Sequence, residues 1–169
     1  MQVKARWLLC AGCVGLVVAA SPVAAQTVSC TVAATPMAFG GYDPSSPTAL
    51  GPVTSTISAQ CSVPPGSGNV SGFALSVALS TGASGSYAAR RMNSSPPGDT
   101  VRYNIYTSAA PVAIWGDGSG GSVTVPLTFP KLTPGQGGRQ SALAYGFVPP
   151  LQDVAVANYA DTIMVIATW

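Results

Sequence analysis

The C-terminal stretch, residues 158–169, is the feature that most constrains the fold. Its sequence, NYADTIMVIATW, is rich in β-branched and aromatic residues, which is typical of a strand. A period of two gives it two apolar faces, formed by Ile163, Val165, Ala167 and Trp169 and by Met164 and Ile166. Such a strand needs cover on both faces and partners on both edges. Two interpretations follow: a central strand of a complete sandwich, or a strand that accepts a partner from another chain.

Residues 1–25 predict a secretory signal peptide. Basic Lys4 and Arg6 precede an apolar run that is too short to span a membrane, and small residues precede the cleavage position. A lipoprotein signal at Cys13 is the alternative, although the residues before Cys13 fit it poorly. We therefore expect an exported product, residues 26–169, that forms one domain.

Two cysteines, Cys30 and Cys61, remain after cleavage of the signal peptide. In an oxidising compartment such a pair predicts a disulfide, and two buried free thiols are the alternative. Closing this loop contributes on the order of 3.5 kcal/mol by the chain-entropy estimate. The spacing of the two cysteines matches no metal motif.

Charge and composition exclude several classes of function. Without Lys4 and Arg6 the exported chain is formally neutral, which argues against nucleic-acid binding. The sequence has no His and no Glu, and its Asp residues are scattered singly, so it offers no general base and no ligand cluster. We therefore predict no enzyme activity, no metal and no cofactor.

Two other motifs each allow a binding role and a plainer structural one. Arg90 and Arg91 could bind an anionic group, although adjacent basic residues more often form a solvated loop or strand end. Tyr103, Tyr106 and Trp115 could line a sugar site, although packing in the core or on a sheet is the commoner role of such residues.

Short β-rich runs separated by Gly, Pro and Ser clusters predict an all-β sandwich or barrel. Phe73, Leu75 and Val77 alternate with small residues and give the clearest one-sided strand. Pro126 marks its run as an edge strand or a bulge. The expected strands cover residues 27–34, 53–63, 73–79, 101–106, 123–129, 143–148 and 158–169, with a loop over 130–140.

Several segments, in order, resemble the spore coat protein U domain family, whose members include subunits of archaic chaperone–usher pili. The matching segments are CTV at 30–32, FGGYDP at 39–44, TISAQC at 56–61, LSTG at 79–82, RM at 91–92, YNIY at 103–106, WGDG at 115–118 and YADTI at 159–163. The resemblance implies an immunoglobulin-like β-sandwich that is incomplete because it lacks one strand. It also implies three kinds of partner: a periplasmic chaperone that supplies the strand, an outer-membrane usher and other pilin subunits.

The resemblance predicts that the final strand is the edge of a groove that accepts a strand from another chain. We expect Ile163, Val165 and Ala167 to line it, with support from Phe73, Leu75 and Val77 on the opposite sheet. Only four residues lie between the predicted cleavage position and Cys30, and they span at most about 14 Å. We therefore expect a subunit that accepts a strand without donating one, or one that does not assemble by ordinary donor-strand exchange.

The predicted function is that of a structural, pilin-like subunit of a surface fibre for adhesion and biofilm formation. The rival interpretation is a complete, monomeric secreted sandwich that binds carbohydrate or another surface.

Overall fold

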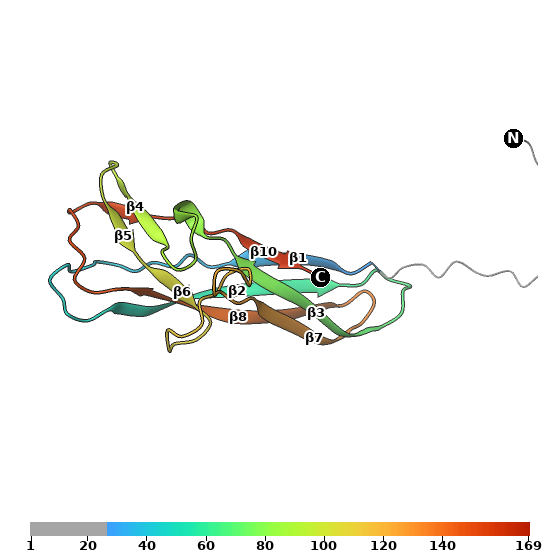
Figure 1. Cartoon of the computed structure of the whole chain (residues 1–169). Coiled ribbons are helices and arrows are strands. Elements are labelled where there is room, and N and C mark those ends of the chain that lie inside the picture. Colours follow the sequence, from blue (N-terminus) through green and yellow to red (C-terminus); the bar gives the residue numbers. More distant parts are fainter. Residues whose placement is uncertain (1–26) are drawn as a thin grey trace, which may run out of the picture.

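Antiparallel strands in three sheets build the chain, as the computed structural model of residues 27–169 shows (Figure 1). The predicted signal peptide lies outside these described residues. The strands are β1 Ser29–Ala34, β2 Leu50–Ser62, β3 Val70–Leu79, β4 Arg91–Ser95, β5 Thr100–Arg102, β6 Asn104–Tyr106, β7 Val125–Leu132, β8 Gly137–Val148, β9 Asn158–Ala160 and β10 Val165–Thr168, with a short 3-10 turn at Gly82–Ser84. The sheet orders are β1-β2-β8-β6, β10-β3-β7 and β5-β4-β9. The expected all-β sandwich is confirmed.

The hydrophobic core lies between the first two sheets. On β2 the residues Ile57, Ala59 and Cys61 are buried on alternate positions, as a strand with one inward face requires. β3 buries Leu75 and Val77 in the same way, so its predicted one-sided pattern is confirmed. Within the described residues, no helix is long and apolar enough to cross a membrane.

The predicted loop over 130–140 is wrong. β7 continues to Leu132 and β8 begins at Gly137, so only residues 133–136 connect the two strands. Pro130 does not interrupt β7, because β7 is the edge of its sheet and a missing N–H there costs no ladder bond. Pro126 lies on the same edge strand, as predicted.

The predicted strand over 101–106 divides between two sheets. β5 belongs to the third sheet and β6 to the first, and the chain crosses between them at Tyr103. Val101, Tyr103 and Ile105 nevertheless share one buried face, as their spacing predicts. The crossover therefore joins the third sheet to the core.

The final stretch also divides, which corrects the prediction of one continuous strand. β9 pairs with β4, whereas β10 pairs with β3. Asp161 interrupts the strand because its carboxylate accepts hydrogen bonds from Tyr103 Oη (2.7 Å) and from the backbone N–H of Ala83 (2.9 Å). These bonds hold the connection between β9 and β10 against a neighbouring turn.

Two residues for which the sequence allowed either a binding role or a structural role, Trp115 and Arg90, lie in the interior. Trp115 is fully buried and donates from Nε1 to the carbonyl of Val77 (2.9 Å), so the core interpretation is confirmed for it. Arg90 is also fully buried, and the expectation of a solvated end is wrong for this residue. Its guanidinium donates to the carbonyls of Ser80 and Trp115 and to Oδ1 of Asn104, at distances of 2.8–3.2 Å.

Candidate functional site

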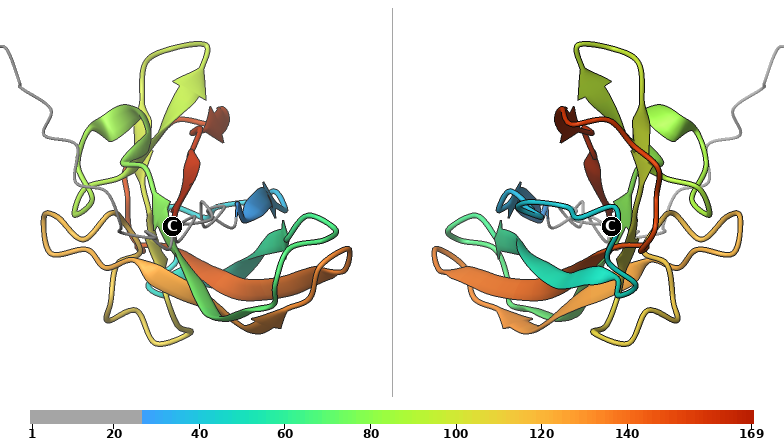
Figure 2. Two further views of the ribbon diagram at one scale, coloured as in Figure 1. Left: turned by 90° about the vertical axis from the view of Figure 1, so that its right-hand side faces the viewer. Right: turned by 90° about the vertical axis from the view of Figure 1, so that its left-hand side faces the viewer.

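Two sheet edges face each other without being paired. Within residues 27–169, β1 pairs only with β2 and β10 pairs only with β3, so each strand presents one free edge. The end-on views show β1 (blue) and β10 (red) beside each other, above the curved strands β2 and β8 (Figure 2). An unpaired edge exposes backbone N–H and C=O groups that a further strand can bind.

The ladder with β3 fixes which backbone groups of the final segment point outward. Met164 directs both its backbone groups towards Ser80: its carbonyl accepts from the N–H of Ser80, and its own N–H donates to Oγ of Ser80 (2.9 Å each). Because backbone direction alternates along an antiparallel strand, the N–H and C=O groups of Ile163, Val165 and Ala167 point away from β3.

The edge of β1 has the same arrangement. The N–H of Thr35 donates to the carbonyl of Thr56 in β2 (3.0 Å), so the backbone groups of Ala34, Val32 and Cys30 point away from β2. Cys30 lies opposite Cys61 with a Cα–Cα distance of 4.1 Å, and the two form the predicted disulfide. The disulfide therefore fastens the edge strand to the centre of its sheet.

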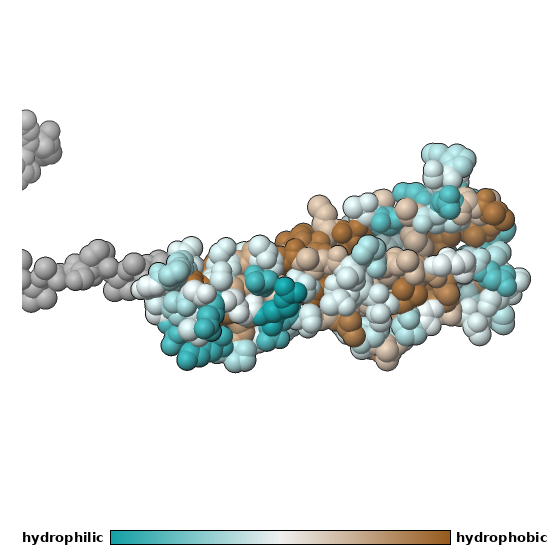
Figure 3. Space-filling model, turned by 180° about the vertical axis from the view of Figure 1, so that it is seen from behind, coloured by the Kyte–Doolittle hydropathy of each residue, from teal (hydrophilic) through white to brown (hydrophobic). Residues whose placement is uncertain are grey.

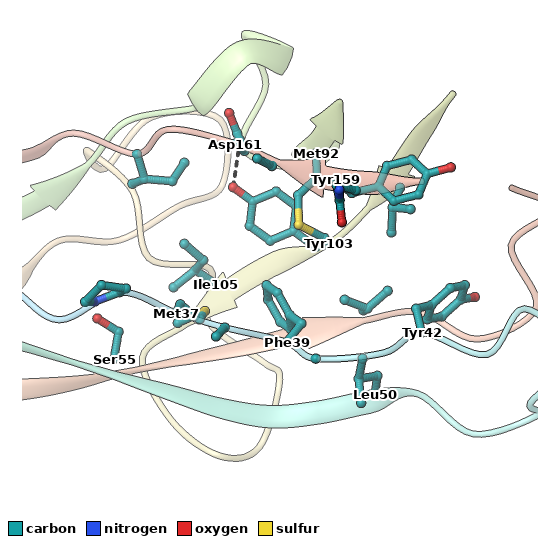
Figure 4. Close-up of a pocket in the computed structure, with 18 of the residues that line it drawn as sticks. Met37, Phe39, Tyr42, Leu50, Ser55, Met92, Tyr103, Ile105, Tyr159 and Asp161 are labelled. Atoms are coloured by element: carbon teal, nitrogen blue, oxygen red, sulfur yellow. Dashed lines mark hydrogen bonds between the residues drawn. The ribbon is translucent and has the colours of Figure 1, made fainter. Parts of the chain in front are cut away.

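A groove of about 950 Å³ lies beside these edges and is lined by residues of all three sheets (Figure 4). One rim is formed by residues 34–42, which start at the end of β1, and the other by residues 154–163, which lead into β10. The floor includes Leu50, Ile57, Tyr103, Ile105, Ala144 and Val148. Seen from behind, hydrophobic residues gather along the side of the molecule on which the groove opens (Figure 3). The groove is thus an open continuation of the core.

The predicted groove residues divide into two groups. Ile163 and Val165 line the groove, and Ala167 faces buried Val77 further along β10. Beyond the groove, Cα atoms of β1 and β10 come within 8 Å of each other. The open part of the groove therefore ends near Ala34 and Val165.

The expectation that β3 supports the groove from the opposite sheet is wrong. Phe73, Leu75 and Val77 belong to β3, which is the hydrogen-bonded neighbour of β10 in the same sheet. They pack in the closed core, Phe73 against Phe129 at 5.9 Å between ring centroids. A period of two predicts which face a side chain occupies, but it does not identify the neighbouring strand. Support from the opposite sheet comes from β2 and β8.

The first rim contributes side chains that the sequence did not identify. Met37 and Phe39 point into the groove, and Phe39 meets Tyr103 edge to face with ring centroids 5.8 Å apart. They lie over Gly146 of β8, where an added Cβ would fall 2.2 Å from the sulfur of Met37 and 2.7 Å from Phe39. The run at 39–44 resembles a turn because of its glycines, and the alternation of Met37 and Phe39 is the signal that could have revealed the rim.

A single charged side chain lies among the groove-lining residues of the described chain, and it is Asp161. Its carboxylate accepts from Tyr103 Oη, as the dashed line in Figure 4 marks, and from the N–H of Ala83 and of Thr162. Burial, followed by the bond to Asp161, raises the pKa of Tyr103 far above its usual value. The phenol of Tyr103 therefore keeps its proton as the donor to Asp161, and the rest of the lining is uncharged.

The geometry suits the binding of an extended chain. The two edges supply outward backbone groups, and the floor supplies apolar contacts. Among the described residues, no group of three or more Cys, Asp, Glu or His side chains lies close enough to hold a metal ion.

A solved structure shares the fold of this chain, and a family model matches its sequence. No curated protein matches it. A solved structure of the CsuC–CsuE chaperone–tip adhesion subunit pre-assembly complex, from archaic chaperone–usher Csu pili of Acinetobacter baumannii, matches with a TM-score of 0.55 and 18% identity. The match covers 85% of this chain and 40% of the matched chain, and at this identity it shows the fold alone. The model of the Spore Coat Protein U domain matches residues 15–166. The chain therefore belongs to the Spore Coat Protein U domain family.

Proposed function

We propose that this chain is an exported subunit of a chaperone–usher pilus, and that its groove accepts a β-strand from another chain. The observation that carries the proposal is the pair of free edges, β1 and β10, that flank an apolar groove open to solvent. The family and the fold shared with a pilus chaperone–subunit complex agree with this role.

The inserted strand would bind in two ways. Its backbone would pair with the outward N–H and C=O groups of Val165 on one side and Ala34 on the other, which supplies much of the affinity. Its alternate side chains would point to the floor formed by Ile57, Ile105 and Val148, which sets the register. Proposed lining residues are therefore Ile163 and Val165, with Ala167 added as the strand extends along β10.

Insertion along the whole of β10 requires the two edges to separate. Two strands that flank a third lie about 9.5 Å apart, because neighbouring strands are spaced by about 4.8 Å. Since β1 and β10 come within 8 Å, the incoming strand must open this end. We infer that binding starts at the open groove and then extends towards Ala167.

The proposal assigns successive partners to this one site. A periplasmic chaperone would supply the first strand, and a neighbouring subunit would replace it at an outer-membrane usher. Residues 1–25 would direct export and be removed, leaving residues 26–169 as the domain that reaches the surface fibre. We place the role of the fibre in adhesion and biofilm formation, without catalysis.

The test is to co-express Val165→Asp with the cognate chaperone. An unpaired carboxylate in the groove costs several kcal/mol, so the chaperone complex and the fibre should both be lost. Ile166→Asp is the matched control, because this neighbouring side chain points outward and is 45% exposed. A second control, Ala49→Asp, places the same charge in the exposed loop before β2. Both controls should behave as wild type, and retention of the complex by Val165→Asp would contradict the proposal.

Hydrogen exchange separates this proposal from the complete monomeric sandwich. The amide of Val165 should exchange rapidly in the chain alone and slowly in the chaperone complex, because it points to the free edge. The amide of Ile166, which faces β3, should be protected more evenly in both. Slow exchange of Val165 in a stable monomer would show that the edge is already closed, and the binding-module interpretation would then be correct.

A further inference from the structure

Two arginines lie side by side on the outer face of the β4–β5 hairpin. Arg91 and Arg102 are cross-strand partners, and both are exposed. The N–H of Tyr103 donates to the carbonyl of Arg90 (3.1 Å), which makes the adjacent Arg91–Arg102 pair the narrow, non-hydrogen-bonded kind. The Cα atoms of such a pair lie about 4.5 Å apart, and the side chains leave the sheet in the same direction.

Neither guanidinium has a partner within the described chain. No side-chain hydrogen bond or ion pair of residues 27–169 engages Arg91 or Arg102. In contrast, Arg90 is buried in the interior with its guanidinium hydrogen-bonded, and Arg139 donates to Oε1 of Gln60 (3.0 Å). Like charges directly opposite each other destabilise a strand pair, so an anion held between them would be favoured.

The two arginines share a small pocket of about 240 Å³ with Thr100, Gln152 and Asp153. Asp153 offsets one of the two positive charges, which leaves a net charge of about one for a ligand to neutralise. Leu151 and Val154 complete a lining that is mainly polar.

The wall of this pocket is held by bonds to the backbone of β5. Gln152 is 6% exposed, and its amide spans the edge: Oε1 accepts from the N–H of Arg102 (2.7 Å) and Nε2 donates to its carbonyl (3.0 Å). The backbone N–H of Gln152 in turn donates to Oη of Tyr42 (2.8 Å). Leu151, directly before it, has a φ of 55°, a left-handed conformation that a branched side chain rarely adopts and that often marks a functional position.

The geometry points to a binding site for the carboxylate of an acidic sugar, such as a uronic acid residue of a polysaccharide. Two adjacent guanidinium forks suit the two oxygens of a carboxylate, and the Thr100 hydroxyl suits a hydroxyl of a sugar ring. A peptide strand is less suited at Arg102, because the amide of Gln152 already occupies both main-chain groups of that residue. The site does not depend on strand insertion into the groove.

Calorimetric titration of the purified exported chain with a short oligogalacturonate tests the assignment. We expect binding at low ionic strength that weakens as salt is added. Arg91→Gln and Arg102→Gln should each weaken it about tenfold or more, as loss of a charge-assisted bond predicts. Lys131→Gln removes an exposed charge from β7 and should change nothing. The melting temperature should stay constant or rise in both arginine variants, because each relieves the repulsion of the pair.

Two control ligands are titrated in the same way: a neutral glucan and a tetraglutamate of similar length. Absence of binding by the neutral glucan would support the requirement for a carboxylate. Failure to bind oligogalacturonate, or equal loss in Lys131→Gln, would overturn the site. Binding of tetraglutamate as tightly as oligogalacturonate would overturn the assignment to a sugar in favour of an acidic peptide.

Discussion

The closed core and the groove are two parts of one space between the sheets, and they differ in what borders them. In the closed core, Leu75 and Val77 of β3 are flanked by β7 and β10 and are almost fully buried. In the groove, Ile163 and Val165 have the same inward direction but border an edge that has no partner within residues 27–169, and they are only half-buried. The same alternation of side chains thus gives a finished interior or an open binding site, according to whether a further strand is present.

The largest effect should come from the disulfide that fastens β1, one border of the shared space. Cys61→Ser should lower the free energy of unfolding by roughly 2–5 kcal/mol, the usual cost of losing a native disulfide. Denaturant titration measures the change. In wild type, thiol titration of the denatured, unreduced exported chain should find no free thiol, and two free thiols would contradict the Cys30–Cys61 pair.

Truncating one residue in each part tests the comparison directly. Leu75→Ala should cost roughly 2–5 kcal/mol, because a buried leucine leaves a cavity. Ile163→Ala should cost clearly less in the chain alone, because its side chain is only half-buried. In the strand-bound complex the two costs should approach each other. Equal costs in the chain alone would show that the groove is already as closed as the core.

The smallest effect concerns the polar pair at the groove floor. The pKa of Tyr103 is raised in the folded chain, so the folded state holds its proton after the unfolded state has lost it. The free energy of unfolding should therefore fall as the pH rises above about 10, by about 1.4 kcal/mol per pH unit for this one group. Tyr103→Phe should remove this contribution and also cost about 1–2 kcal/mol at neutral pH, since Asp161 loses a donor.

Stability measured by denaturation across alkaline pH checks this expectation. Tyr87 and Tyr159 also have raised pKa values, each mainly through burial, so part of the slope should persist in the variant. A slope that Tyr103→Phe leaves unchanged would show that the phenol does not carry the effect.

Much of the local structure was predictable because it depends on residues close in sequence. Period-two alternation predicted the inward faces of β2 and β3, and Pro126 predicted an edge strand. The same alternation put Ile163, Val165 and Ala167 on one inner face, and the cysteine count predicted the disulfide.

The tertiary structure alone decided which strands are neighbours and which groups are satisfied. Alternation predicts which face of a strand a side chain occupies, but it does not predict which strands pair. It therefore could not show that β3 lies in the same sheet as β10. The break at Asp161 depends on Tyr103, 58 residues away, and the burial of Arg90 depends on the carbonyls of Ser80 and Trp115, which come from other segments of the chain. The pairing of Arg91 with Arg102 likewise needed the hairpin register. The sequence by itself determined the β class, the inward faces and the disulfide. Only long-range packing determined where strands break and pair and where the groove lies, because these depend on contacts between segments remote in the chain.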